Sequence, residues 1–503
     1  MVYFLRSQVL KGMKPLNPKA PFDFLKLLKE SFPTGASSPD ASASIVDPTT
    51  SPSNADNPSL STTTASARGQ IVPGEGRGDV PASEVREEAI RLQPEALARS
   101  TLPPPESDVP EGLSTPALSL PINPRKRRRK FACKRAQRRK LEKKALNETG
   151  ASQDTLSQVL SHGAAVEVDL DASELEAARG AHTGKPGKKE NLGSQAERER
   201  QYSLEDLLAQ GFEHIEWDGR TPIPIVDRSG RIIAVLAGQP GSDYEQDLLE
   251  AFKLFSEAGE EAGLGPTAAG GRHKRGSFPA FNRGVTMGMG SPTPVALNPG
   301  LMSGILDRLV GAKAVRRMAA YQNAAFSLWA PRVHDEYKNA QNALRGRFPH
   351  LPDNFPGISD FAAAAFNLGG KVWTFKHRDF LNWPFGWCAI TALGAFDPRR
   401  TAQLILWELK LVLNFPHGAT VLIPSGVITH SNTPVATGDT RMSFTQYTAG
   451  AIFRWVENGC KTEKELQAAD PQCWAEMQAG KDSAYIRRIH NFSTIEELMS
   501  RIQ

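Results

Sequence analysis

Two side chains in one short stretch are of the types that hold a catalytic metal ion. Residues 372–379 read Val-Trp-Thr-Phe-Lys-His-Arg-Asp, a β-branched and aromatic run typical of a strand that ends at a polar corner. Residues two apart on a strand share a face, so His377 and Asp379 would project side by side. They supply two-thirds of the two-histidine, one-carboxylate set of non-haem Fe(II) oxygenases, which leaves positions open for O2 and a cosubstrate. A lone His-x-Asp is more often a surface turn, so the assignment depends on later residues.

A third ligand is expected from a turn further along the chain. Residues 418–430 contain Pro-Ser-Gly followed by Val-Ile-Thr-His, which indicates a sharp turn between two strands. The second strand would carry His430 back toward His377 and Asp379. This stretch resembles the second metal motif of cupin-like double-stranded β-helices. A single histidine at a strand end is more often a satisfied surface or core residue, but its order after the other two favours a ligand.

Arg441 and Ser443 form a further pair, eleven residues beyond the third histidine. They alternate onto one face of a predicted strand that otherwise holds aromatic and small residues. A buried guanidinium requires a carboxylate, ideally in bidentate geometry, and the strand contains no acid. The distal carboxylate of 2-oxoglutarate would satisfy Arg441 and Ser443 while its keto-acid end chelates the iron. The alternative is a salt bridge to an acid elsewhere in the fold.

The elements that must position these side chains are short apolar strands separated by Gly- or Pro-containing turns. Such spacing predicts a sandwich or barrel and not a parallel sheet with crossover helices. We therefore expect an α+β fold with a jelly-roll (double-stranded β-helix, cupin-like) core over residues 361–456 and flanking helices at 243–262 and 301–344. The strands of this core, after the first metal motif, are predicted at 387–396, 403–407, 411–415, 420–423, 427–430 and 441–452.

Residues 1–200 differ in composition from the rest of the chain. Ser, Thr, Pro, Ala and Gly dominate residues 31–122, and such a segment cannot bury enough apolar surface to offset the entropy of ordering. Residues 141–196 are also polar and are expected to be a linker. We therefore expect residues 1–200 to be mostly disordered.

Folding is expected to begin near residue 201 with a helix capped by Ser203. Strands should follow at 212–217 and 231–237. The catalytic domain would end at residue 456, and residues 457–503 are predicted to be a helical extension. In that extension Ser493 and Glu496 have the spacing of a capping box.

Positive charge is concentrated in residues 125–144, whereas the chain from residue 201 onward is close to neutral, although the whole protein carries a net charge of +5. So dense a basic run indicates a nuclear-import signal, a contact to nucleic-acid phosphates, or both; a solvated arm without a partner is the alternative. We expect a nuclear protein that binds DNA. Residues 263–300 form a second basic, glycine-rich segment without acids, which would lie along a phosphate backbone or form a mobile surface loop.

Several other classes of protein are disfavoured by the composition. The four cysteines form no Cys-x-x-Cys pair and no zinc-ligand spacing, which is typical of a reducing compartment. The apolar run at residues 2–5 is too short for a signal peptide, and no apolar stretch approaches a membrane span. We expect a soluble intracellular protein without a membrane partner.

Taken together, the motifs resemble the TET/JBP family of DNA-base dioxygenases, and most closely its compact fungal branch, over residues 201–456. The resemblance implies Fe(II) bound by His377, Asp379 and His430, and 2-oxoglutarate bound by Arg441 and Ser443. It also implies oxidation of the methyl group of 5-methylcytosine or thymine after the base is flipped out of the duplex. The matching positions are His377-Arg378-Asp379-x-x-Asn382, Gly386, His430, Arg441-x-Ser443 and Tyr447.

Within this resemblance, Asn382 lies where the family hydrogen-bonds the flipped base. Two positions depart from the family pattern. Ala449 replaces a base-contacting histidine found in several members, and Arg399-Arg400 stands where a glycine-rich turn is expected. Two alternatives stay open: a 2-oxoglutarate hydroxylase acting on an N-methylated base, RNA or protein, and a catalytically inactive jelly-roll module associated with nucleic acid.

Overall fold

The computed structural model describes residues 13–15, 157–158, 160, 163–175, 178–179, 181–185, 194–241, 243–264, 272–288 and 290–502. The residues described belong to one of two compact units of the chain, made of Met1–Phe32 and Pro124–Gln503. The predictions of disorder at 31–122 and of a basic import or DNA-binding segment at 125–144 lie outside the described residues.

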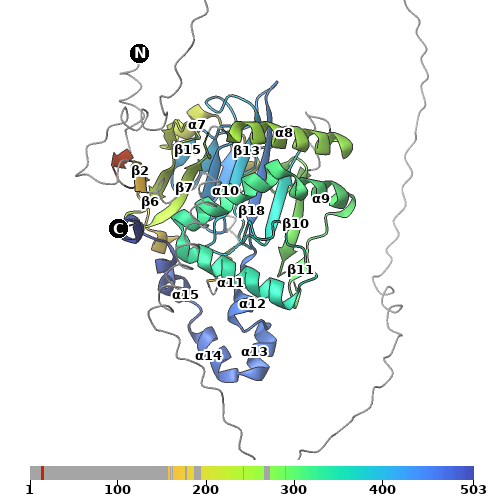
Figure 1. The fold of residues 1–503 in the computed structure, drawn as a ribbon. Helices are drawn as coiled ribbons and strands as arrows, with labels where there is room; N and C mark the ends of the chain where they lie inside the picture. The colour runs from red at the N-terminus through yellow and green to blue at the C-terminus, as the bar shows by residue number, and fades with distance from the viewer. Residues whose placement is uncertain are drawn as a thin grey trace, which may run out of the picture. The chain divides into compact units, whose positions relative to one another are not determined.

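The fold combines α-helices with one large, mostly antiparallel β-sheet (Figure 1). Its ten strands run in the order β1-β2-β6-β7-β16-β13-β18-β12-β10-β11, and only the β2–β6 pair is parallel. Because strands distant in sequence are neighbours in this sheet, it brings together the segments that carry the candidate site. The bounds are β1 Met13–Pro15, β2 Ala164–Glu167, β6 Ile223–Val226, β7 Ile232–Gly238, β16 Thr420–Ile423, β13 Cys388–Ala395, β18 Thr440–Tyr447, β12 Ala363–Asn367, β10 Ala280–Thr286 and β11 Val295–Ala296.

A second, four-stranded sheet has the order β17-β14-β15-β5. It consists of β17 (His430–Asn432), β14 (Leu404–Leu406), β15 (Leu411–Leu413) and β5 (Glu213–Ile215), the last parallel to β15. Two-stranded sheets are formed by β3 (Ala178–Arg179) with β4 (Thr183–Gly184) and by β8 (Arg272–His273) with β9 (Gly276–Ser277).

Strand β18 shows how alternation divides side chains between the site and the core. Successive residues of a strand point to opposite faces. Arg441, Ser443 and Thr445 line a small cavity between the large and small sheets. Met442 and Phe444 instead pack into a hydrophobic core with helices on the other face. The period of two predicted for this strand therefore separates the polar pair from the apolar residues.

Helices α8, α9, α10 and α11 cover one face of the large sheet (Figure 1). Helix α10 also makes polar contacts with the sheet, because the buried Gln322 Nε2 donates to Thr391 Oγ1 at 2.8 Å and Gln322 Oε1 accepts from Gln446 Nε2 at 2.8 Å. The helices, with short 3-10 turns, are α6 Gln195–Arg198, α7 Leu204–Ala209, α8 Tyr244–Glu261, α9 Ser303–Gly311, α10 Lys313–Trp329, α11 Pro331–Arg347, α12 Gly450–Glu457, α13 Glu463–Ala469, α14 Pro471–Ala479, α15 Ala484–Arg487, α16 Ile495–Ile502, η1 Ala172–Glu174, η2 Gly300–Met302 and η3 Ile489–Asn491.

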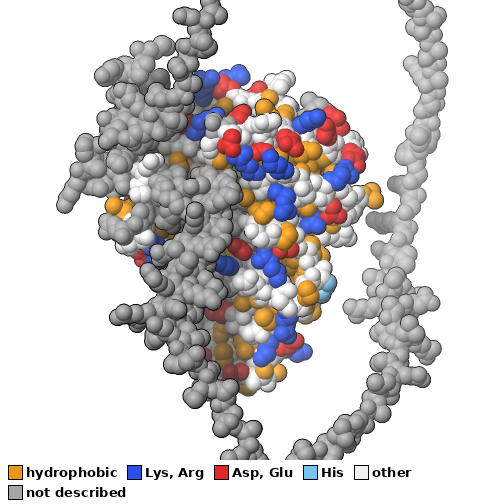
Figure 2. Space-filling model, in the orientation of Figure 1, with side chains coloured by type: hydrophobic (Ala, Val, Ile, Leu, Met, Phe, Trp, Pro, Cys, Tyr) orange, Lys and Arg blue, Asp and Glu red, His pale blue; other side chains and the backbone are white. Residues whose placement is uncertain are grey.

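The outer surface of these helices carries charges of both signs. Figure 2 shows Lys and Arg side chains interspersed with Asp and Glu over this face. Arg317 of α10 pairs with Asp243 at 2.7 Å and also with Asp247. Paired opposite charges are typical of a solvated helical face, so no ligand is needed to explain these charges. In the part of the chain that the structure describes, no helix has the length and apolar character needed to cross a bilayer.

Order begins earlier than the predicted boundary at residue 201. Strand β2 pairs with β6 in the large sheet, where Val166 is fully buried opposite Ile225. Ala181 is also buried, and its carbonyl oxygen accepts a hydrogen bond from Trp383 Nε1 at 2.9 Å. The prediction of a linker throughout 141–196 is therefore wrong. The apolar run of β2 is only a few residues long, and its partner strand β6 lies far away in the sequence.

Three local predictions also differ from the structure. Residues 372–379 form no regular strand and contain one isolated bridge, at His377, because their backbone groups pair with several different segments. The strand predicted at 427–430 begins at His430, after a turn. The strand predicted at 441–452 ends at Tyr447, and helix α12 begins at Gly450.

The two predicted helix caps have different outcomes. Ser203 caps α7, and its hydroxyl accepts from the backbone N–H of Asp206 while the Asp206 side chain accepts from the backbone of Ser203. At the C-terminal end the capping box is shifted by one residue, to Thr494 and Glu497. Ser493 is instead buried. In sequence, Ser493 and Thr494 are equally suitable caps. Because the tertiary structure buries Ser493, Thr494 is the cap.

Candidate metal centre

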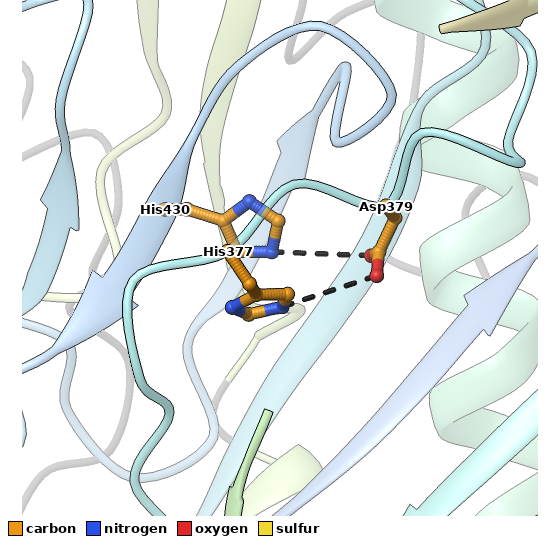
Figure 3. Close-up of side chains that lie close together, drawn as sticks. All are labelled: His377, Asp379 and His430. Atoms are coloured by element: carbon orange, nitrogen blue, oxygen red, sulfur yellow. Dashed lines mark ion pairs between the residues drawn. The ribbon is translucent and has the colours of Figure 1, made fainter. Parts of the chain in front are cut away.

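The three side chains predicted as metal ligands converge at one point (Figure 3). His377 Nε2 lies 3.9 Å from Asp379 Oδ1, and His430 Nε2 lies 3.9 Å from Asp379 Oδ2. One potential ligand atom from each residue lies within 4.8 Å of the other two. This grouping suits one ion bound on one side by two imidazoles and a carboxylate.

Backbone pairing, not strand alternation, brings the two histidines together. His377 N donates to His430 O at 3.1 Å, and His430 N donates to His377 O at 2.9 Å. Asp379 is placed by its own backbone N–H, which donates to Ser425 O at 2.9 Å. The side chains therefore meet as predicted, although the local conformation that positions them differs from the strand expected.

Hydrogen bonds to carbonyl groups fix which nitrogen of each imidazole is available. His377 Nδ1 lies 2.7 Å from Phe375 O, and His430 Nδ1 lies 3.0 Å from Ile428 O. Because a carbonyl oxygen only accepts, Nδ1 carries the proton in both rings. The lone pair is then on Nε2, the atom that faces Asp379. Metal-bound histidines are typically oriented through their second nitrogen in this way.

The protonation states of the cluster suit a cation. Burial and the adjacent His430 lower the pKa of His377 to about 3. Burial acts to raise the pKa of Asp379, but Arg275 and the neighbouring histidines hold it below its usual value. At neutral pH the Nε2 lone pair of His377 and the Asp379 carboxylate therefore face one another without a proton between them. A divalent metal requires deprotonated ligands and would relieve this repulsion.

Arg441 faces a small cavity beside these ligands. The cavity measures about 60 Å³ and is lined by His377, Asp379 and His430 as well as by Arg441 and Ser443. It thus joins both halves of the predicted site, the metal ligands and the cosubstrate pair, in one space.

The Arg441 guanidinium is buried without an acidic partner. Its side chain donates from Nη1 to Val372 O at 2.7 Å, while Nε has no hydrogen-bond partner. Burial lowers the pKa of Arg441 to about 10, so the group is still a cation at neutral pH. The salt bridge considered as an alternative is not found among the residues described by the structure. Because an unpaired buried cation is costly, this pocket fits an anionic ligand.

Ser443 lies on the same face of β18 and is also buried. Its Oγ accepts from Asn367 Nδ2 at 2.9 Å. The Ser443 hydroxyl proton can therefore be donated to a further acceptor in the cavity. A carboxylate would receive that proton together with the Arg441 N–H.

Asn382 belongs to a buried hydrogen-bonded group next to Asp379. Asn382 Nδ2 lies 3.1 Å from Ser425 Oγ and 3.2 Å from Cys388 Sγ, and these last two atoms are 2.8 Å apart. Each of these three side chains therefore has a hydrogen-bond partner within the group.

The Asn382 amide makes both of its contacts in this group through its nitrogen. Its NH2 group points to Ser425 and Cys388, so Oδ1 is the atom left for a ligand. Oδ1 has no hydrogen bond among the described residues, yet it is not one of their fully buried unpaired atoms. Burial raises the pKa of Cys388 to about 12, which keeps its thiol protonated as this arrangement requires.

A larger cavity of about 950 Å³ adjoins the metal centre. Asn382 and Cys388 line it together with several basic residues. Sequence reasoning missed the role of Arg275 here, whose Nη1 lies 3.6 Å from Asp379 Oδ1. The only sequence signal for this residue was its place in the basic, acid-free segment 263–300. The basic residues lining the cavity are Arg198, Lys274, Arg275, Lys376 and Arg378.

The two departures from the family pattern have local explanations. Ala449 forms an isolated bridge with Asn382 and is buried, and its methyl group offers no hydrogen bond. Arg399 and Arg400 are exposed and pair with Asp397 at 3.0 and 3.3 Å. Both arginines therefore contact an acid of their own loop.

Comparison with known proteins adds little to this geometry. No protein-family model and no curated protein matches the sequence. Among solved structures, that of NgTET1 in complex with 5mC DNA is similar with 14% sequence identity and a TM-score of 0.32; the match covers 46% of this chain and 79% of that chain. A likeness this weak assigns no fold, family or activity to this chain.

Proposed function

We propose that this protein is an Fe(II)- and 2-oxoglutarate-dependent dioxygenase that oxidises the methyl group of a modified DNA base, preferably 5-methylcytosine. One observation carries the proposal. Two Nε2 lone pairs and a carboxylate meet beside a buried arginine that has no acidic partner in the described part of the chain. The same small cavity contains both groups.

His377, Asp379 and His430 would hold the iron, with their protonation and tautomers already set by Phe375, Ile428 and the surrounding charges. Fe(II) with 2-oxoglutarate and O2 supplies oxidation of a C–H bond to an alcohol, with succinate and CO2 as the other products. Arg441 and Ser443 would bind the distal carboxylate of 2-oxoglutarate and hold it in place.

The two sheets support the predicted double-stranded β-helix. The small cavity is lined by His430 and Asn432 of β17 in the small sheet and by Arg441 and Ser443 of β18 in the large one. A cosubstrate held between facing sheets is the arrangement that the jelly roll would provide.

Asn382 supports cytosine as the base. Its free Oδ1 accepts hydrogen bonds, and cytosine presents an exocyclic amino donor where thymine presents a carbonyl acceptor. Two facing acceptors would leave both unpaired, which costs binding energy. The base must be flipped out of the duplex to reach this cavity, and basic residues at the cavity wall, such as Arg198 and Lys274, would contact the phosphate backbone.

The direct test measures succinate formation from Fe(II) and 2-oxoglutarate, with and without methylated duplex DNA, together with mass analysis of the recovered nucleosides. We expect hydroxymethylcytosine and DNA-stimulated succinate release. Succinate release without oxidised bases in any methylated DNA would favour another substrate, such as RNA or protein. Absence of both turnover and cosubstrate binding in folded protein would favour the inactive binding module.

We also propose that residues 125–144 direct the protein to the nucleus and strengthen its binding to DNA, since this basic run carries the excess positive charge. Deleting it should reduce nuclear accumulation of a fluorescent fusion and the salt-sensitive part of DNA affinity. Chemistry on a short oligonucleotide should be unchanged. An inactive deletion variant would contradict this division of roles.

A further inference from the structure

One acidic side chain contacts both segments that carry the candidate metal ligands. Glu408 lies in the turn between β14 and β15. Glu408 Oε1 accepts from Arg378 Nη2 at 2.6 Å and from Thr429 Oγ1 at 2.6 Å, and Oε2 accepts from the Thr429 backbone N–H at 2.7 Å. Arg378 stands between His377 and Asp379 in sequence, and Thr429 directly precedes the third ligand.

These contacts matter because the local backbone provides little rigidity. His377 and Asp379 lie on a segment without regular strand structure, and the His377–His430 bridge is isolated. A side chain that bonds the residue next to each ligand would therefore restrict how far the two segments can separate. Thr429 is held from both sides, because its own carbonyl oxygen accepts from Trp407 N at 3.0 Å.

The contact to Arg378 is a buried ion pair. The Arg378 side chain is only 5% exposed, and its Nη2 lies 2.6 Å from Glu408 Oε1. Water and salt screen a buried pair less than an exposed one, so this contact holds the His377–Asp379 segment more firmly than a surface ion pair would.

We propose that Glu408 is a positioning residue for the metal centre, which holds the His377–Asp379 segment against the His430 segment through Arg378 and Thr429. This inference rests on the proposed metal site but not on its cosubstrate or DNA. Glu408 does not line either cavity, so it acts through the ligands and not on the reactants.

The test is metal affinity in Glu408→Gln, measured by titrating the full-length, metal-free protein with Co(II) and following its visible absorption. We expect affinity to fall about tenfold, the lower end of the loss caused by removing a hydrogen-bond partner of a metal ligand, because Glu408 bonds the residues next to the ligands and not the ligands themselves. Asp353→Asn is the matched control, because Asp353 pairs with Arg345 at 2.8 Å and its side chain is 21% exposed, against 23% for Glu408. The control should keep Co(II) affinity within about twofold of the wild-type value, because the ion pair it loses is remote from the ligands.

Thermal unfolding of the metal-free proteins separates positioning from general stability. If the two variants are destabilised equally but only Glu408→Gln loses Co(II), the positioning role stands; equal Co(II) affinity in both would overturn it.

If Glu408→Gln does not fold, Thr429→Val removes one Glu408 contact while keeping the Arg378 pair. Thr429→Val should bind Co(II) several-fold more weakly than wild type, and unchanged affinity would again overturn the role. A wild-type protein that binds no Co(II) would refute the metal centre itself, a different result from failure of Glu408.

Discussion

The two cavities beside Asp379 differ in how much of their polar chemistry is left for a ligand. In the small cavity, the Nε2 atoms of both histidines and the Arg441 Nε atom have no hydrogen-bond donor or acceptor supplied by the described chain. In the large cavity, the amide nitrogen of Asn382 is already bonded, and Tyr447 Oη donates to Asn282 Oδ1 at 3.0 Å.

This difference indicates where the site is specific. A set of prepared but unpaired groups strongly favours the charged ligands that complete it, here a cation and a carboxylate. In the large cavity the Asn382 amide nitrogen and the Tyr447 hydroxyl are bonded within the protein, and Asn382 Oδ1 is the acceptor left for a base. The chemistry of the reaction should therefore depend on several residues, whereas the choice of base should depend on few.

The largest effect is expected from Asp379→Ala, which removes the only carboxylate of the ligand set and so tests the small cavity directly. We expect Co(II) affinity to fall more than about 100-fold, beyond the loss caused by changing an outer partner, and turnover to vanish. Asp397→Ala, which removes an acid from an exposed Arg pair, should leave both unchanged. Metal-dependent succinate formation by the Asp379 variant would refute its ligand role.

Arg441→Met tests the cosubstrate half of the small cavity separately from the metal half. A hydrogen-bonded charge contributes about 1.5–3 kcal/mol, so the KM for 2-oxoglutarate should rise roughly 10- to 100-fold. Affinity for Co(II), measured without cosubstrate, should stay near the wild-type value because Arg441 is not a ligand. A parallel loss of both would mean that the two halves are not independent.

Asn382→Ala tests the large cavity. Loss of one hydrogen bond to the base should lower kcat/KM for 5-methylcytosine DNA about tenfold and reduce preference over thymine. Succinate formed without DNA should be nearly unaffected. The measurement compares oxidised nucleosides with total succinate. An equal fall in both would show that Asn382 supports the metal centre through Ser425 instead of reading the base.

The smallest expected effect is on stability against pH in the metal-free protein. The pKa of His377 falls from 6.5 to about 3 on folding, so between these values the unfolded chain binds the extra proton. Stability from this group is therefore fully present above pH 6.5 and is lost as pH falls toward 3. The free energy of unfolding of His377→Gln, measured in urea, should change with pH less steeply than that of the wild type, by up to about 1.4 kcal/mol per pH unit. Parallel slopes would contradict the lowered pKa.

Sequence patterns predicted part of the candidate site, because strand alternation and helix-capping residues are local properties. The period of two in β18 placed Arg441 and Ser443 on one face, and Ser203 started α7 as predicted. Local patterns failed where a distant partner decides the conformation. The linker predicted at 141–196 contains β2, whose partner β6 lies far along the chain, and residues 372–379 are bridged to the His430 segment instead of forming a strand.

The sequence by itself determined which donors are present and in what order, from His377 and Asp379 to His430 and Arg441. Only the tertiary structure decided that both Nε2 atoms face one carboxylate, that Arg441 has no acid beside it among the described residues, and that Glu408 contacts both ligand segments. The physical reason is that tautomer, pairing and burial each depend on a partner from another segment, and spacing within one segment carries no information about that partner.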